Sequence, residues 1–156
     1  MSTSFEDKIK EQAGAYLEDG ERVLVAFIAQ PRGTNMALTG GLAPNSIGRR
    51  KVKEVRRAGE AAGLKVTRPM ALALTDRRLI VFKISPPIAM GKGADVKELV
   101  SAVALSDVDS IEIKRLLVGK VVVVTVGGTV VKLEAGAGAN AKGMAEEFAR
   151  QRSSLV

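Results

Sequence analysis

The chain has 156 residues, enough for one domain with its own core, and we expect a single domain over residues 1–156. It contains no cysteine and no histidine, which excludes disulfides, Ser-His and Cys-His nucleophiles and the commonest zinc ligands. The chain has a net charge of +7, few aromatic residues and no apolar run of the roughly 18 residues that a membrane span needs, so we expect a cytoplasmic protein. We also expect no metal, no cofactor and no enzymatic activity.

The first 30 residues predict a helix followed by a strand. Over residues 1–20 apolar side chains recur at helical spacing, with Ser4 as the N-cap and Gly20 as the stop. The run RVLVAFIAQ that follows is apolar and ends at Pro31. It predicts a buried strand.

Residues 31–69 form a basic insertion. They begin with a stretch rich in Gly, Asn and Pro, which predicts a loop, and continue into a helix from about Ile47 to Ala62 with a thin apolar stripe. The insertion has nine basic and two acidic residues, whereas the rest of the chain has 15 of each. Its candidate ligand-binding cations are Arg49, Arg50, Lys51, Lys53, Arg56, Arg57, Lys65 and Arg68.

Four interpretations of these cations remain open. The helix is either a solvated face that keeps an exposed insertion soluble, or it binds an anionic membrane surface, nucleic acid or an acidic protein. The scarcity of aromatic residues argues against binding to single-stranded nucleic acid.

Six strands and a helix are predicted after the insertion. The corner Asp76–Arg77 joins two of the strands, and Asp76 is suited to bonding the local backbone. Gly127 and Gly128 lie between β-branched runs, the pattern of a type I′ hairpin. A C-terminal helix is predicted over residues 139–152, with Asn140 as its N-cap. The strands are Met70 to Thr75, Arg78 to Ile84, Glu98 to Leu105, Asp109 to Leu116, Lys120 to Val126 and Thr129 to Glu134.

Two local motifs do not predict a site. The stretch GAGANA, residues 136–141, matches a dinucleotide fingerprint, but the 156-residue chain leaves no room for the following strand or its acidic residue. We interpret it as a linker. Asp107 and Asp109 are two positions apart, which fits turn chemistry before a strand better than a carboxylate pair for catalysis.

Several of these stretches resemble bacterial members of the pleckstrin-homology-like superfamily, in the group with GRAM-type domains. The phrase ALTDRRLIVF is similar to their L-T-x-x-R-L hairpin, and VALSDVDSIEIKR is similar to their entry into an Ile-rich strand. An initial helix followed by GERVL, and the closing helix AKGMAEEFARQ, also fit.

The resemblance implies a mainly β fold of the α+β class: seven antiparallel strands in two nearly perpendicular sheets, a partly open barrel, and a C-terminal helix closing one end. It implies that Arg78 braces its hairpin. It also places the insertion between strands 1 and 2, where lipid-binding members hold phosphoinositides. Gln30 and Pro31 end the first strand, and Lys65 and Arg68 have the wrong spacing for the headgroup motif.

We therefore predict a non-catalytic binding or adaptor module whose basic loop contacts an acidic partner. The partner is anionic lipid, with a peripheral position at the inner membrane face, or an acidic protein. The alternatives are a self-associating homo-oligomer, which uses strand edges and the apolar arm Met36 to Leu42, and a weak, non-specific nucleic-acid binder.

Overall fold

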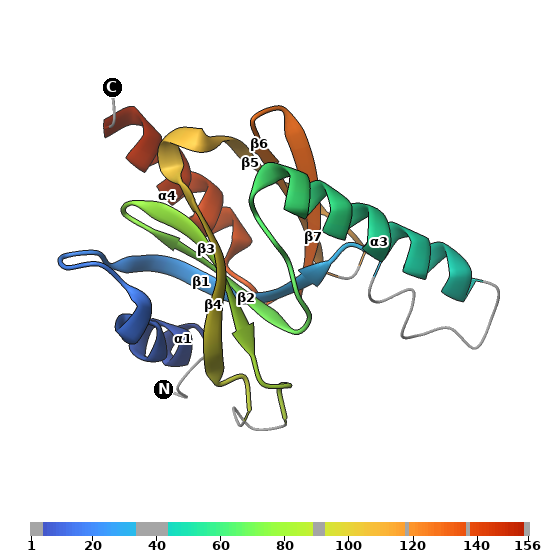
Figure 1. Ribbon diagram of the computed structural model, residues 1–156, viewed down its shortest axis with the longest axis horizontal. Helices are drawn as coiled ribbons and strands as arrows, with labels where there is room; N and C mark the ends of the chain where they lie inside the picture. The colour runs from blue at the N-terminus through green and yellow to red at the C-terminus, as the bar shows by residue number, and fades with distance from the viewer. Residues whose placement is uncertain (1–4, 34–43, 89–92, 118, 137, 155–156) are drawn as a thin grey trace.

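A computed structural model describes residues 5–33, 44–88, 93–117, 119–136 and 138–154, with only the backbone for residues 44–48 (Figure 1). In chain order the elements are α1 (Phe5–Ala13), the 3-10 helix η1 (Gly14–Tyr16), β1 (Val23–Pro31), α3 (Pro44–Ala62), β2 (Met70–Thr75), β3 (Arg78–Ile84), β4 (Val96–Ala104), the 3-10 helix η3 (Leu105–Asp107), β5 (Val108–Arg115), β6 (Lys120–Val126), β7 (Thr129–Ala135) and α4 (Ala141–Ser154).

The seven strands are antiparallel and follow the order β4-β3-β2-β1-β7-β6-β5. β1 joins the two halves of the sheet, because Ala29 pairs with Met70 of β2 on one side and with Ala135 of β7 on the other. The predicted open barrel of seven strands with a C-terminal helix is confirmed. Its two predicted sheets are one continuous sheet, since β1 is long enough to pair with both neighbours.

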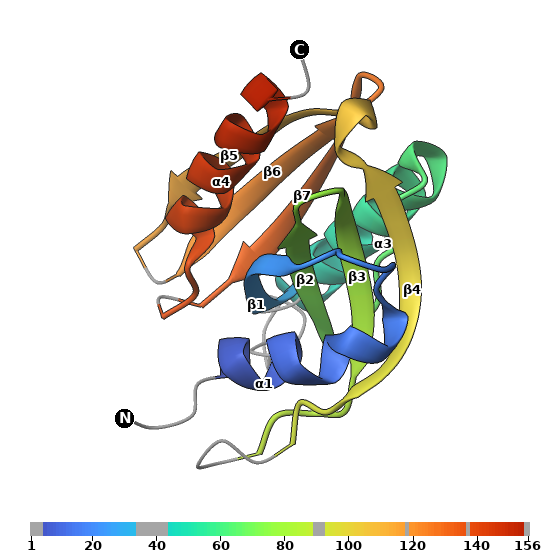
Figure 2. The same ribbon diagram turned by 90° about the vertical axis from the view of Figure 1, so that its left-hand side faces the viewer.

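Strands β1 to β3 are covered on both faces. One face carries Phe27, Leu72 and Val81 into the main core, together with β5 to β7 and α4. The other face carries a second cluster, in which Ala73 and Phe82 pack beneath α1. Figure 2 shows α1 and α4 on different sides of the β1 to β4 strands. Burial of both faces explains why β2 is apolar at nearly every position instead of alternating.

The insertion contributes to the core. Val55 of α3 and Leu64, which follows it, are in the same cluster as Met144 and Phe148 of α4. The interior of the open barrel is therefore covered by both helices. The helix begins at Pro44, earlier than the predicted Ile47, because proline is well suited to the first helical position.

The N-terminal helix is shorter than predicted. It ends at Ala13 and continues as a 3-10 turn to Tyr16, whereas the predicted stop, Gly20, lies in a separate turn with φ +79. The predicted N-cap Ser4 and the apolar arm Met36 to Leu42 fall outside the described residues.

The Gly127–Gly128 turn allows a direct test of backbone conformation. Both residues have positive φ, +56 and +83, and a Cβ on either would meet no atom within 4 Å. We expect Gly128→Ala to reduce the free energy of unfolding by about 1–2 kcal/mol, since an alanine disfavours this conformation. Gly136→Ala is the control, because it has equal space and no positive φ. Equal urea midpoints for the two variants would contradict this explanation.

Candidate functional site

Helix α3 is held on the sheet by one apolar side. Val52 and Val55 are buried, and the helix packs along β7. Near its end a Cβ on Gly59 would lie 2.5 Å from the carbonyl oxygen of Leu64, so the chain after the helix passes too close for a larger residue. The amide of Leu64 donates to the Gly59 carbonyl at 2.8 Å. These contacts fix the rotation of α3 about its own axis.

The rotation of α3 leaves most of its cations facing outward. At 100° per residue, the cations other than Lys51 lie within one arc that avoids the side of Val52 and Val55. All of them are exposed, and no ion pair links any of them to an acid in the part of the chain that the structure describes. We call this surface the α3 basic face. It comprises Arg49, Arg50, Lys53, Arg56 and Arg57.

Lys51 lies on another side of the helix, where it borders a hollow of about 240 Å³ between α3 and the sheet. Arg32 and Lys132 also line this hollow, and Glu54 is its acidic residue. Arg32 is ion-paired with the buried Glu134 at 3.5 Å. The structure thus brings together three cations from β7, α3 and the residue after β1.

Sequence reasoning did not find Arg32, Lys132 or Glu134 as parts of one group. Lys132 and Glu134 are on β7, and only the pairing of β7 with β1 brings them beside the start of the insertion. Of the other predicted cations, Lys65 and Arg68 are exposed on the connection between α3 and β2, outside the α3 basic face.

The two arginines of the β2–β3 corner have different surroundings. Arg78 donates from Nε and Nη2 to the Glu21 carboxylate at 2.9 and 2.7 Å. Thr75 donates to the same carboxylate at 2.7 Å, and the Glu18 amide does so at 2.9 Å. Arg77 makes one long contact with Glu18, at 3.5 Å, and both of these side chains are largely exposed.

The carboxylate of Glu21 remains charged although its side chain is fully buried. Burial alone raises its pKa, but hydrogen bonds from Arg78, Thr75 and the Glu18 amide lower the pKa to about 2. The hydrogen bonds from Arg78 to Glu21 raise the pKa of Arg78. This corner therefore ties β2 and β3 to the segment that precedes β1.

The hydrogen bonds at the turns differ from the prediction that Asp76 bonds the local backbone. The local bonds at the corner come from Thr75, whose hydroxyl oxygen accepts from the amides of Arg77 and Arg78. Asp76 instead accepts from the amide of Arg22, 54 residues away, at 3.1 Å. Asp109 accepts from the amide of Gly128 at 2.9 Å and so links β5 to the β6–β7 turn.

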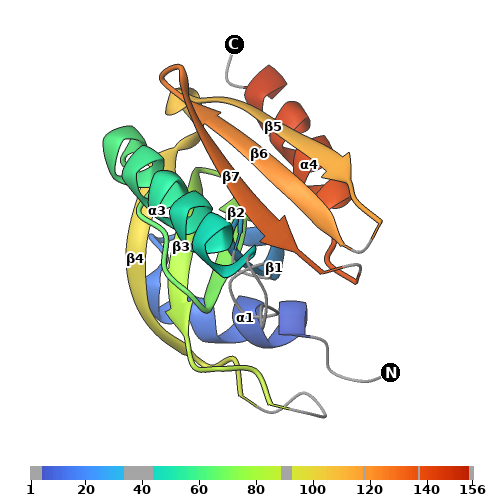
Figure 3. The ribbon, with the colours of Figure 1, turned by 90° about the vertical axis from the view of Figure 1, so that its right-hand side faces the viewer.

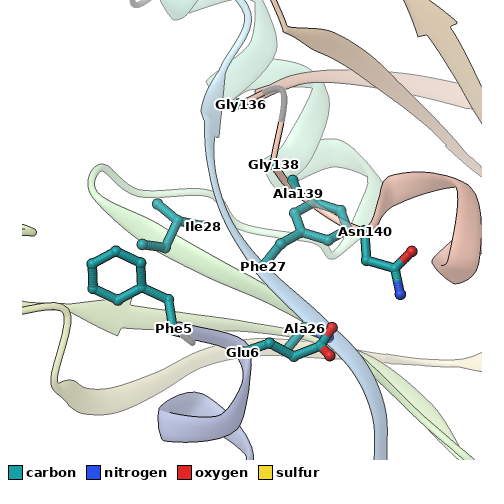
Figure 4. Close-up of a pocket in the computed structure, with 9 residues that line it drawn as sticks. All are labelled: Phe5, Glu6, Ala26, Phe27, Ile28, Gly136, Gly138, Ala139 and Asn140. Carbon is teal, nitrogen blue, oxygen red and sulfur yellow. The ribbon is translucent and has the colours of Figure 1, made fainter. Parts of the chain in front are cut away.

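A larger hollow, of about 460 Å³, lies beside β1 at the place where its pairing changes from β2 to β7. Figure 4 shows Phe5 and Ile28 on one side of β1, and Phe27 and Asn140 on the other. The Glu6 carboxylate accepts from the amide of Ala26 at 3.3 Å and lies 3.6 Å from Lys10. No cation lines this hollow among the described residues, so it is chemically distinct from the α3 region.

Two other kinds of feature are absent from the described residues. None of the helices there has both the length and the apolar character needed to cross a bilayer. The same residues hold no group of three or more acidic side chains placed to share a metal ion.

Comparison with known proteins finds similarity to solved structures but not to any family model. The sequence matches no protein-family model and no curated protein. The structure is similar to that of a DUF1696 family protein with a pleckstrin-homology domain from Shewanella loihica PV-4, at 14% identity and a TM-score of 0.45. The similarity covers 92% of this chain and 93% of that chain.

The seven antiparallel strands and the C-terminal helix are those implied by the resemblance in the sequence. The chain folds as an open barrel of seven antiparallel strands with a C-terminal helix. The likeness to pleckstrin-homology-like and GRAM-type domains stays a prediction.

Proposed function

We propose that this protein is a binding module that attaches to anionic membrane surfaces through the α3 basic face. The supporting observation is a set of five exposed cations, without acidic partners among the described residues, on one side of a helix that is packed into the core. Near an anionic surface each Lys or Arg contributes about 1 kcal/mol. A docked helix also loses less conformational entropy on binding than a flexible arm does.

The hollow beneath α3 adds to this proposal. Arg32, Lys51 and Lys132 border a space of about 240 Å³, and Glu54 is the acidic residue in its lining. A phosphate oxygen accepts hydrogen bonds from both guanidinium and ammonium groups. A phospholipid headgroup is therefore a suitable occupant for the edge of the α3 basic face.

Vesicle sedimentation tests the proposal. We expect the protein to sediment with phosphatidylcholine–phosphatidylserine vesicles and not with phosphatidylcholine alone, and added salt should reduce the effect. Arg50→Ala combined with Arg57→Ala should lower the partition coefficient about 30-fold, since two cations contribute about 2 kcal/mol.

The matched control is Arg22→Ala combined with Arg150→Ala, which removes the same charge from two exposed positions elsewhere. It should lower partitioning far less, because only general attraction is lost. Equal losses in the two double variants, or no preference for phosphatidylserine, would refute attachment through α3. Retention of duplex DNA or of an acidic protein without vesicle binding would favour those partners.

Self-association is the second candidate. The outer edges of β4 and β5 have no strand partner among the described residues, and such edges promote pairing between copies. Light scattering of the free protein at increasing concentration distinguishes the two. A strict monomer excludes self-association through these edges.

A further inference from the structure

The turn between β5 and β6 exposes two leucines to solvent. Leu117 is fully exposed and Leu116 is 38% exposed, whereas most leucines of the described residues are buried. Lys114 and Arg115, which come directly before them, are also exposed. An apolar tip next to cations is the combination that binds the boundary between lipid headgroups and acyl chains.

The base of this turn is well fixed. The Leu116 amide donates to the Gly119 carbonyl at 3.1 Å. Gly119 has φ +81 and lies against β7, where a Cβ would be 2.7 Å from the carbonyl oxygen of Ala135. Lys120 donates from Nζ to the carbonyl of Ala139 at 2.9 Å. The leucines therefore extend from an anchored hairpin, which reduces the entropy lost on insertion.

Strand register places this turn at the same end of the sheet as the start of the insertion. Lys120 pairs with both Arg115 and Ala135, and Ala135 pairs with Ala29 near the end of β1. The connection from β3 to β4 also leaves from this end, because Met70 pairs with Lys83, and it carries Ile88 at 65% exposure.

The basic half of α3 lies toward this end as well. Lys51 borders a hollow with Lys132, whereas the last residues of α3 border one with Gly127 and Thr129 at the start of β7. The helix thus runs antiparallel to β7, and Figure 3 shows α3 packed against the same half of the sheet as this strand. Arg49 and Arg50 precede Lys51 on the same helix.

We propose that the β5–β6 turn inserts Leu116 and Leu117 into the headgroup–acyl boundary of an anionic bilayer, next to the cations of the same end. This inference rests on the proposed membrane attachment and adds a contact that salt does not screen. The two signals differ in kind, because the cations provide attraction over a Debye length and the leucines provide contact only after docking.

Fluorescence reports the insertion directly, because the natural chain contains no tryptophan. Leu117→Trp introduces a single indole at the tip, and Val130→Trp introduces one at the exposed start of β7. With phosphatidylcholine–phosphatidylserine vesicles, the indole at position 117 should shift to shorter wavelength and be quenched by brominated acyl chains. The indole at position 130 should show neither change.

Partitioning of serine variants completes the test. We expect Leu117→Ser to lower the partition coefficient about tenfold at low and at high salt, and Val130→Ser to leave it unchanged.

Three outcomes would overturn the proposal. Vesicle binding with an unshifted indole at position 117 rejects the insertion and leaves attachment through α3 intact. Absence of vesicle binding by the natural protein rejects both proposals. A shift that depends on protein concentration without vesicles indicates a second copy of the chain as the occupant.

Discussion

Arg78→Ala is expected to lower the free energy of unfolding by about 3–5 kcal/mol, because it leaves the buried carboxylate of Glu21 without its cation. For a chain of this length the melting temperature should fall by about 10 °C. The natural control is its neighbour: Arg77→Ala removes an exposed pair with Glu18 and should reduce stability by less than about 1 kcal/mol. Equal urea midpoints for the two variants would show that the buried network does not stabilise the fold as described.

The same network makes the stability of the fold depend on pH. The pKa of Glu21 is lowered from 4.5 to about 2, so the folded state holds its proton less tightly than the unfolded chain does. The stabilisation is therefore fully present above pH 4.5 and is lost as the pH falls from 4.5 toward 2. In urea unfolding over this pH range, the free energy of unfolding should fall less with acid for Glu21→Gln than for the natural protein. The same dependence of the free energy of unfolding on pH in both proteins would contradict a charged Glu21 in the folded state.

The second large effect is expected at Phe82, which lies in the cluster beneath α1. Its side chain is fully buried, and its ring centroid is 5.7 Å from that of Tyr16. We expect Phe82→Ala to reduce the free energy of unfolding by about 3–5 kcal/mol, through lost burial and the cavity that remains.

Phe5→Ala is the matched control, since Phe5 is only partly buried and borders the hollow beside β1. Phe5→Ala should reduce the free energy of unfolding by about 1 kcal/mol. Equal losses at the two positions in urea unfolding would show that α1 does not cover the sheet in the way described.

The contrast between the two arginines bears on function. They are adjacent in the sequence, but Arg78, the first residue of β3, reaches Glu21, whereas Arg77 in the preceding turn lies at the surface. A variant of Arg78 that weakens vesicle binding would therefore do so through unfolding. Arg77→Ala leaves the fold intact and tests directly whether this corner contacts a partner.

Local patterns in the sequence were sufficient for most of the sheet. The bounds of β2, β3 and β6 match the predicted strands, and the paired glycines at 127 and 128 have the positive φ that their hairpin requires. These features depend on side-chain alternation and turn chemistry within a few residues. The concentration of positive charge between residues 31 and 69 is equally a property of the chain order.

Tertiary structure alone decided which groups meet. Arg78 donates to Glu21, which is 57 residues away in the sequence, and the amide of Gly33 donates to Glu134, which is 101 residues away. The periodicity of the sequence carries no information over such separations. Packing of Val55 and Leu64 into the core set the rotation of α3 and so determined that its cations face outward. The exposure of Leu117 was likewise not readable from its apolar character, because a leucine in a run is buried or exposed according to what the rest of the chain places around it.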